Sequence, residues 1–383
     1  MKKHIYLDYA AATPMDPVVK KATEPYWSER FHNPSAIYLS SRAVKKDLDT
    51  FRARVARLLG AKPAEIVFTS GATEANNLAI SGVMSRHPKG ELLVSAIEHE
   101  SVLEPAKLYK NKQVPVDSNG RIILNKLSNL ISDKTILVSI MMVNNELGTV
   151  QPLSEVSNLI TQVREARLKS GNHLPLYLHS DGAQAGNYFD LQASRLGVDM
   201  MTVNGGKIYG PKQSGALLAK AGVDLAPLIL GGGQEYGRRS GTESLALIAG
   251  FTEALEQAQS KYKQELKRTR ELREFFAAEL QNHLGDLTIN GSIKHQSPHI
   301  LSITLPGADN ERLVMELDEA GIQAGVGSAC SAAKGQSSHV LAAIGLSSKL
   351  ARSTLRFSFG RQTTKEDLSY AVKTLVRLTA VQR

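Results

Sequence analysis

Cysteine is almost absent from this sequence of 383 residues. Cys330 is the single cysteine, so neither an internal disulfide nor a thiolate metal cluster can form within one chain. The ten histidines form no HExxH pair, and there is no EF-hand loop or Cys/His cluster, so no metal site is predicted. The one thiol is therefore either a filler of the core or a reactive group.

Long apolar runs are also missing. No stretch reaches the roughly 18 apolar residues that a membrane-spanning helix needs. The opening MKKHIYLDYAAATP has two lysines but lacks the apolar core of a signal peptide. No tract rich in Ser, Pro, Gln or acidic residues indicates disorder. We therefore expect a cytoplasmic protein that has no membrane partner and is folded along almost all its length.

The balance of charge is basic, with a formal charge of +9 and a pI near 9.4. Much of the excess lies in residues 259–274, QSKYKQELKRTRELRE. Charges of alternating sign are typical of a solvated helix face rather than of a nucleic-acid-binding patch. A nucleic-acid partner is therefore not expected.

Five short apolar runs, each bounded by turn residues, are typical of strands that are covered on both faces. They span residues 91–97, 135–144, 176–181, 200–205 and 215–219. Helical patterns lie between several of them, as at residues 73–86 and 154–171. Strands that alternate with helices predict an α/β lobe with a mostly parallel sheet flanked by helices.

After about residue 242 the pattern changes. A long helical pattern runs to about residue 285, and short segments such as 299–307 and 311–321 follow it. Thr364 and Asp367 are spaced as a capping box before a final helix. We predict a large domain of residues 16–255 and a small α+β domain of residues 1–15 and 256–383, which carries Cys330.

Polar residues follow four of the predicted strands. They are Glu98-His99-Glu100, Asn144-Asn145-Glu146, His179-Ser180-Asp181 with Gln184, and Asn204 followed by Gly205, Gly206 and Lys207. Ligands of open α/β sheets collect at the carboxyl ends of the strands. Four polar strand ends on one edge of a sheet therefore predict an active site at that edge.

Lys207 and Asp181 indicate what chemistry this site could perform. Pyridoxal phosphate needs an amine for its aldehyde and an acidic partner for its pyridine nitrogen. A lysine that follows a buried strand suits the first need, and Asp181 suits the second. The alternatives are a surface lysine at 207 and a turn cap at 181. His99 could lie over the ring or move protons, or it could be a structural histidine.

Two further stretches carry candidate groups. Residues 68–80, FTSGATEANNLAI, predict a strand, a turn and a helix whose first N–H groups, near Ala72 and Thr73, could bind phosphate; a plain helix cap is the alternative. Cys330 lies among small residues in GVGSACSAAKG, which favours a flexible loop and a reactive nucleophile over a buried structural cysteine. The attacking form would be the thiolate, which a neighbour or a cofactor must favour.

Long motifs along nearly the whole chain together resemble the cysteine desulfurases of the NifS/IscS group. The motifs are IYLDYAAATP, FHNPSA, FTSGATEANNLAI, EHESV, VNNELGTVQP, SDGAQ, GGKIYGPKQSGAL, GGGQEYGRRSGTES, GSACSA and RFSFGR. Members of that group are class V aminotransferase-family enzymes with the aspartate aminotransferase fold, called fold type I. The resemblance implies this fold, pyridoxal 5'-phosphate as cofactor and L-cysteine as substrate.

The resemblance also implies roles in holding the cofactor. Lys207 would form the Schiff base, Asp181 would pair with the pyridine nitrogen, and Gln184 would lie beside the ring hydroxyl. His99 would stack on the ring and serve as acid and base. Ala72, Thr73 and Asn204 would hold the phosphate from the same chain. Thr242 would hold it from the neighbouring subunit, because the motif that contains Thr242 contributes to the partner's site in that group. A homodimer with shared active sites is implied.

For the substrate, the resemblance implies that Arg356, Asn33 and Asn145 bind the carboxylate of L-cysteine, with Asn145 also beside the cofactor. A bidentate guanidinium suits that planar anion. Lys207 and His99 would move protons, and the thiolate of Cys330 would attack the substrate sulfur. Alanine would leave and Cys330 would keep a persulfide, to be passed to a sulfur-acceptor protein in iron-sulfur cluster assembly or tRNA thiolation.

The sequence departs from the group at two places. The residues before the lysine are usually Ser-Gly-His, and here they are Asn204, Gly205 and Gly206. We therefore expect weaker retention of the cofactor, or compensation by another donor. The sequence ends at Arg383, without the tail that usually docks an iron-sulfur scaffold, so another acceptor is open. The competing interpretations are an aminotransferase or a selenocysteine lyase on the same fold, and a cofactor-poor scaffold protein.

Overall fold

A seven-stranded sheet forms the centre of the larger lobe in the computed structural model, which describes residues 4–327 and 338–382. Only β8 runs against the others. In spatial order the strands are β2 (Ile66–Thr69), β8 (Gly215–Ala219), β7 (Met200–Asn204), β6 (Tyr177–Asp181), β5 (Thr135–Ser139), β3 (Glu91–Ser95) and β4 (Asn111–Val114). The predicted α/β fold with a mostly parallel sheet is confirmed.

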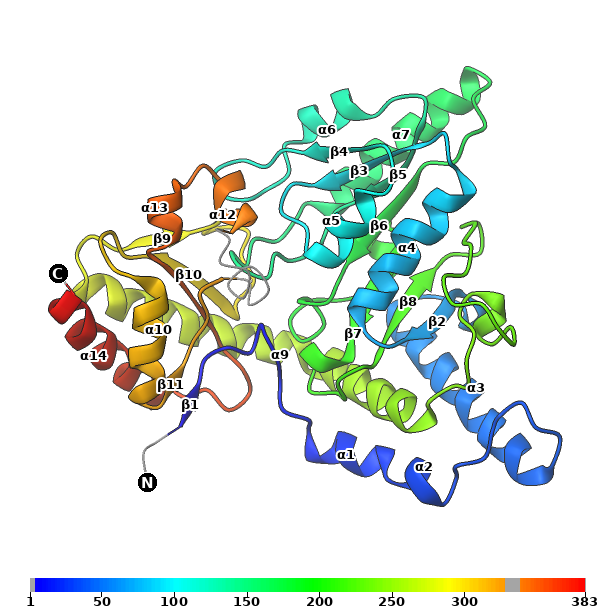
Figure 1. The fold of residues 1–383 in the computed structure, drawn as a ribbon, viewed down its shortest axis with the longest axis horizontal. Helices are drawn as coiled ribbons and strands as arrows, with labels where there is room; N and C mark the ends of the chain where they lie inside the picture. The colour runs from blue at the N-terminus through cyan, green and yellow to red at the C-terminus, as the bar shows by residue number, and fades with distance from the viewer. Residues whose placement is uncertain (1–3, 328–337, 383) are drawn as a thin grey trace.

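Helices cover both faces of this sheet (Figure 1). Within β8, Leu217 and Ala219 belong to one hydrophobic cluster, while Ala216 and Leu218 belong to another. Successive side chains of a strand point to opposite faces, so the apolar residues of β8 alternate between the two cores. The helices of this lobe are α1 (Pro17–Thr23), α2 (Pro25–Ser28), α3 (Leu39–Leu59), α4 (Ala72–Arg86), α5 (Glu100–Ala106), α6 (Leu124–Leu130), α7 (Leu153–Lys169) and α8 (Ala193–Leu196).

The helix α9 (Leu245–His283) runs from the large lobe into the small one (Figure 1). Its first half packs on the large core through residues such as Phe251, and its second half packs on the small core through Phe276. Phe276 contacts Phe357 and Phe359 edge to face, with ring centroids 5.1 and 5.8 Å away. One continuous helix therefore belongs to both hydrophobic cores.

The small lobe contains two short sheets. The first has the order β12 (Thr354–Ser358), β10 (Ile300–Thr304), β9 (Thr288–Asn290), and the second pairs β1 (Ile5–Tyr6) with β11 (Ile322–Gln323). The first strand of the chain thus lies in the small lobe. Its helices are α10 (Asn310–Glu319), α12 (His339–Ala343), α13 (Ser348–Ala351) and α14 (Lys365–Gln382). Val340 and Leu341 of α12, which the prediction assigned to the small domain, pack in the large core. The domain boundaries therefore stay a prediction.

The capping box before α14 forms as the sequence predicts. The backbone N–H of Thr364 donates to Asp367 Oδ2 at 3.0 Å, and the N–H of Asp367 donates to Thr364 Oγ1 at 3.2 Å.

The basic stretch 259–274 lies within α9. None of the helices in the described part of the chain is both long and apolar enough to cross a membrane.

Candidate active site

A cavity of about 330 Å³ lies at the carboxyl ends of the parallel strands. The described residues that line it are Ala10, Ala11, Ala72, Thr73, His99, Ser101, Met141, Val143, Asn145, Asp181, Ala183, Gln184, Asn204, Lys207 and Arg356. Parallel strands place their carboxyl ends on one edge, so the segments that follow β3, β5, β6 and β7 meet there. Nine of the predicted site residues are therefore gathered around one cavity.

Lys207 ends the short turn η2 (Gly205–Lys207) that follows β7. Its Nζ donates to the carbonyl oxygen of Ala10 at 2.7 Å and also to that of Ala11. Burial lowers the pKa of Lys207 from 10.5 to about 8; the Arg356 guanidinium acts in the same direction, while Asp8 and Asp181 oppose it. The amine is therefore far closer to neutrality at physiological pH than an ordinary lysine.

Asp181 ends β6 and is 6% exposed. Its Oδ1 accepts from the backbone N–H of Ala183 at 2.8 Å, and its Oδ2 accepts from Asn76 Nδ2 at 2.7 Å. The first bond is the turn cap that the sequence offered as an alternative. The capping bond does not exclude the predicted role, because the carboxylate also lines the cavity.

His99 lies at the N-cap of α5, beside Asp181 in the cavity wall. Its Nδ1 accepts from the backbone N–H of Ser101 at 3.1 Å and lies 2.8 Å from Ser101 Oγ. Burial lowers the pKa of His99, and Lys207 acts in the same direction, although Asp181 opposes both. A neutral ring is favoured.

Gln184 is held by contacts from both ends of the chain. Its Nε2 donates to the Ala10 carbonyl at 2.9 Å, and its Oε1 lies 3.1 Å from His299 Nε2. His299 stacks on Tyr188 with ring centroids 4.3 Å apart, and burial lowers its pKa to about 3. Since the amide oxygen can only accept, the neutral His299 ring donates to it, which fixes the orientation of Gln184.

Arg356 enters the cavity wall from β12 of the small lobe and is 3% exposed. Its Nη2 forms an ion pair with Asp8 Oδ1 at 2.6 Å, and its Nη1 donates to the Asn145 carbonyl at 2.9 Å. Its buried Nε has no hydrogen-bond partner among the described residues. The guanidinium is thus rigidly held and keeps donor capacity for an anion.

Asn33 and Thr242 are the two described site residues that the structure does not bring to the cavity. Both are exposed, and Asn33 Oδ1 accepts from the backbone N–H of Ser35 at 2.9 Å. The roles predicted for them stay predictions. Cys330 lies outside the described residues. Ser338, the first described residue after the segment that contains Cys330, donates to the buried carboxylate of Glu146 at 2.6 Å.

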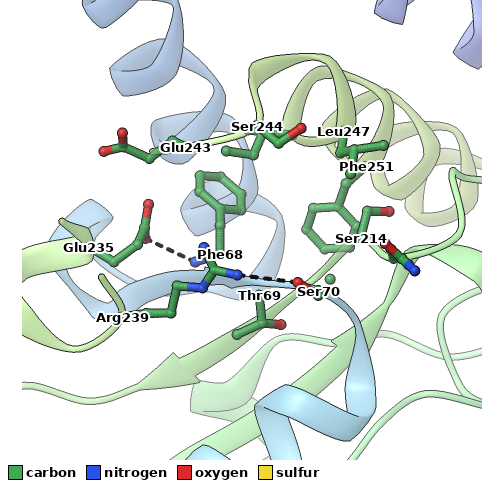
Figure 2. A pocket seen from close by; sticks show the side chains of 13 residues that line it. Phe68, Thr69, Ser70, Ser214, Glu235, Arg239, Glu243, Ser244, Leu247 and Phe251 are labelled. Carbon is green, nitrogen blue, oxygen red and sulfur yellow. Dashed lines mark hydrogen bonds between the residues drawn. The ribbon is translucent and has the colours of Figure 1, made fainter. Parts of the chain in front are cut away.

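Thr242 belongs to a loop of residues 231–244 that is tied to the large sheet. Glu235 in this loop forms a buried, bidentate pair with Arg52 at 2.6 and 2.7 Å and accepts from the N–H of Phe68 at 2.9 Å. Arg239 Nη2 lies 3.2 Å from Ser70 Oγ beside a second cavity of about 60 Å³. Figure 2 shows this contact. These contacts hold the loop while leaving Thr242 exposed.

The sequence departure before Lys207 has a structural counterpart. Asn204 Oδ1 accepts from the N–H of Gly206 at 3.2 Å, so this side chain caps the turn. A Cβ added at Gly206 would meet its nearest atom, Lys212 Cδ, at 3.4 Å, which is an ordinary contact. The backbone therefore does not require glycine at this position.

Several residues of the cavity were not singled out from the sequence. Ala10 and Ala11 line it, Asp8 pairs with Arg356 behind it, and Asn76 and Ser101 connect Asp181 with His99. The only sequence feature that could have indicated Asp8 as a site residue is its position after a short apolar strand in the motif IYLDYAAATP. The sequence of residues 8–11 does not predict that this segment contacts Arg356 and Lys207.

This fold and cavity place the protein among known enzymes. The sequence model described as Aminotransferase class-V matches residues 5–370, so the chain belongs to the class-V aminotransferase family, whose members depend on pyridoxal phosphate. It is 37% identical over 385 aligned residues to the cysteine desulfurase IscS of Dictyoglomus turgidum, covering 99% of this chain and 95% of that protein. It is 39% identical to the cysteine desulfurase IscS 1 of Archaeoglobus fulgidus, covering 97% and 95%.

Solved structures give the same relationship. A NifS-like protein superposes with a TM-score of 0.90 at 30% identity, covering 99% of this chain and all of that one. The structure titled SspA in complex with cysteine has a TM-score of 0.79 at 33% identity, covering 93% and 98%. The expected family and fold type I are confirmed.

Proposed function

We propose that this protein is a pyridoxal-phosphate-dependent cysteine desulfurase, which converts L-cysteine to L-alanine and keeps the sulfur as a persulfide on Cys330. One observation carries the proposal. In a chain related along its whole length to cysteine desulfurases, a partly buried amine of lowered pKa, Lys207, and a buried carboxylate, Asp181, line the same cavity. Those are the two groups that this cofactor needs from a protein.

The cavity fits the cofactor in size and in chemistry. Its volume of about 330 Å³ lies in the range of small-molecule sites. The Lys207 amine would attach the aldehyde, and Asp181 would hold the proton on the ring nitrogen. Gln184, which His299 orients, would face the ring hydroxyl.

The phosphate would lie at the start of α4, where the N–H groups of Ala72 and Thr73 are free of helical partners. Gly71 precedes them with φ 104°, a conformation that favours glycine. Asn204 offers no hydroxyl or cation there, and its Oδ1 already caps the turn. Thr242 would complete the phosphate site from a second copy of the chain.

Replacing Gly206 by histidine should strengthen cofactor retention by roughly tenfold, the gain expected from one added charge-assisted hydrogen bond. The Cβ has room, since its nearest neighbour would lie at 3.4 Å. The measurement is the dissociation constant of pyridoxal phosphate. Gly222→His is the matched control, because a Cβ there would meet no atom within 4 Å. Equal affinities of Gly206→His and the wild type would contradict the prediction.

The substrate carboxylate would bind to Arg356. The ion pair with Asp8 and the bond to the Asn145 carbonyl fix the plane of the guanidinium, and the free Nε together with the remaining Nη hydrogens can face a carboxylate. Because Arg356 comes from the small lobe and Lys207 from the large one, the substrate would bind between the two lobes.

The protein's own groups would then perform distinct tasks. When bound, the cofactor supplies an aldehyde that captures the substrate amine and a cationic ring that accepts electrons from its Cα. Lys207 would move the proton at Cα, and His99 would face the reacting atoms from the cavity wall. The Cys330 thiolate would attack the substrate sulfur, forming an S–S bond as the C–S bond breaks. The carbon keeps the electron pair and gains a proton, so no external oxidant is needed.

The reaction of Lys207 with the cofactor should have a midpoint near pH 8. Only a neutral amine attacks an aldehyde, and burial lowers the pKa of Lys207 from 10.5 to about 8. Below the midpoint the neutral fraction falls about tenfold per pH unit, so the rate should drop as pH falls through 8. The measurement is the initial change in absorbance after pyridoxal phosphate is added to cofactor-free protein. A rate that still climbs towards pH 10.5 would contradict this assignment.

A homodimer is part of the proposal, since Thr242 would serve the partner's site. Its support is the placement of the 231–244 loop, which is fixed by the Arg52–Glu235 pair while Thr242 is exposed and lies away from the cavity of its own chain. We also propose that the dimer acts in the cytoplasm and passes its persulfide to an acceptor protein.

The function is tested by incubating the cofactor-loaded full chain with L-cysteine and a thiol reductant. Equal amounts of L-alanine and sulfide should form over many turnovers. L-serine, which lacks the sulfur, should give neither product and serves as the matched control. Failure to release alanine from L-cysteine would refute the desulfurase assignment.

A further inference from the structure

Four side chains form a continuous hydrogen-bonded path in the wall of the cavity. Asn76 Nδ2 lies 2.7 Å from Asp181 Oδ2 and 2.8 Å from Ser101 Oγ. Ser101 Oγ in turn lies 2.8 Å from His99 Nδ1. Asn76 is fully buried, and Ser101 is 7% exposed. The path connects Asp181, which the proposed function places at the ring nitrogen of the cofactor, with His99, which it places beside the reacting atoms.

The chemistry of these groups gives the path a direction. An ionised carboxylate can only accept hydrogen bonds, and both oxygens of Asp181 do so. Asn76 must therefore turn its NH₂ group towards Asp181. The second hydrogen of the same NH₂ group then points to Ser101 Oγ, so Ser101 accepts there and its own hydrogen is left to donate to His99 Nδ1.

The acceptor at the end of the path is thereby defined. His99 Nδ1 receives the Ser101 hydroxyl and also the Ser101 backbone N–H at 3.1 Å. A ring nitrogen that accepts two donors carries a lone pair, so the proton of the neutral ring lies on the other nitrogen. The two bonds from Ser101 thus select one of the two tautomers of His99.

We propose that Asn76 and Ser101 are positioning residues that hold His99 as its Nε2–H tautomer. Asp181 orients the Asn76 amide, Asn76 orients the Ser101 hydroxyl, and that hydroxyl donates to His99 Nδ1. The proposal rests on the proposed function, in which His99 faces the reacting atoms. A neutral ring that presents Nε2–H to the cavity can stabilise negative charge that develops on a bound substrate. Asp181 would thus act on two groups at once, the cofactor ring and His99.

The surroundings of His99 agree with a neutral ring. Burial, Lys207 and His339 lower its pKa, while Asp181 and Glu100 act in the opposite direction, and the net shift is downward. Its place at the N-cap of α5 adds to this, because the positive end of a helix disfavours a cation.

Asn76 supplies a second sign of direction. Its Oδ1 is buried and has no hydrogen-bond partner among the described residues, while its Nδ2 has two. A buried orphan acceptor is costly. The site therefore keeps the two hydrogen bonds that Asn76 donates and leaves its amide oxygen without a donor. This is expected if the role of Asn76 is to donate to Asp181 and Ser101.

The test compares variants of the path in the full-length protein. Ser101→Ala removes the hydroxyl donor, Ser101→Thr restores it, and Asn76→Leu removes both amide donors. Asn77→Ala is the matched control, since Asn77 lies next in α4 and its side chain donates to the backbone carbonyls of Thr73 and Ser101 rather than to the side chains of the path. Chemical shifts of the His99 ring in histidine-labelled protein report tautomer and pKa without substrate, and His99→Gln identifies the signal.

Wild-type protein should show a neutral His99 with its proton on Nε2. Ser101→Ala and Asn76→Leu should shift the His99 protonation midpoint upward, because Nδ1 loses a donor or the donor loses its orientation. They should also lower kcat for L-cysteine roughly three- to tenfold at unchanged KM. Ser101→Thr and Asn77→Ala should keep the wild-type signal and rate.

The proposal is overturned if wild-type His99 carries its proton on Nδ1, or if Ser101→Ala leaves both the signal and kcat unchanged. Equal shifts in Asn77→Ala would also overturn it, since they would indicate a general disturbance of α4. If the wild type releases no alanine but the His99 signals respond as expected, the proposed function fails and the hydrogen-bonded path stands.

Discussion

Replacing Cys330 by alanine should lower sulfide release from L-cysteine by at least about a thousandfold, as expected when a nucleophile is removed. The reason is specific to this chain. Cys330 is its only cysteine, so no second thiol can attack the substrate sulfur in its place. Binding of pyridoxal phosphate should be unaffected, because Cys330 is not among the groups proposed to hold it. The measurement is sulfide and alanine formation with bound cofactor followed by absorbance.

The matched control is Ser331→Ala, a change of similar size at the next residue, which should retain activity. The same experiment separates the related chemistries. A transaminase or selenocysteine lyase would keep most of its activity in Cys330→Ala, because neither reaction needs the enzyme's own thiol. Persistent sulfide release from L-cysteine by the variant would disprove the persulfide mechanism.

Replacing Lys207 by alanine should abolish turnover, with a loss of roughly four orders of magnitude or more. Two functions are lost together: attachment of the cofactor aldehyde, and movement of the proton at the substrate Cα. The carbonyl of Ala11 loses the Lys207 donor and that of Ala10 keeps only Gln184, so a modest loss of stability should accompany the change. The measurements are activity, the absorbance of the bound cofactor and the free energy of unfolding.

Lys220→Ala provides the comparison. Lys220 follows β8, and β8 is antiparallel to β7, so it lies at the opposite end of the strand pair from Lys207. Its removal should leave turnover and absorbance as in the wild type. A Lys207→Ala protein that still turns over L-cysteine at a rate near that of the wild type would contradict the assignment of this amine.

The sequence predicted the sheet well because each strand carries its own signal. β3, β5, β7 and β8 are mostly apolar and buried, while β6 ends in the buried polar residues His179, Ser180 and Asp181. Each of the five strands begins at or within one residue of its predicted start. The cavity followed from the polar residues after those strands, since parallel strands expose their carboxyl ends on one edge. His99, Asp181 and Lys207 were found in this way.

What the sequence did not predict are partners that meet only through tertiary structure. Asp8 and Arg356 are separated by 348 positions, and neither segment indicates the other. His299 orients Gln184 from the small lobe without any local motif. Asn76 lies within the predicted helix of residues 73–86, and nothing in that pattern distinguishes it from its polar neighbour Asn77. Asn33 illustrates a different limit: the motif that contains it is recognised in the sequence, yet its side chain is exposed and does not line the cavity.

The ion pair between Asp8 and Arg356 bears on how this protein is synthesised. The carbonyls of Ala10 and Ala11 and the carboxylate of Asp8 leave the ribosome first, yet they contact Lys207 and Arg356. Such long sequence separation raises the entropic cost of closing the site and slows its formation. The large sheet can assemble during translation, but the substrate pocket is completed only when β12 has emerged. Nascent chains should therefore acquire the proposed contact of Arg356 with the substrate last.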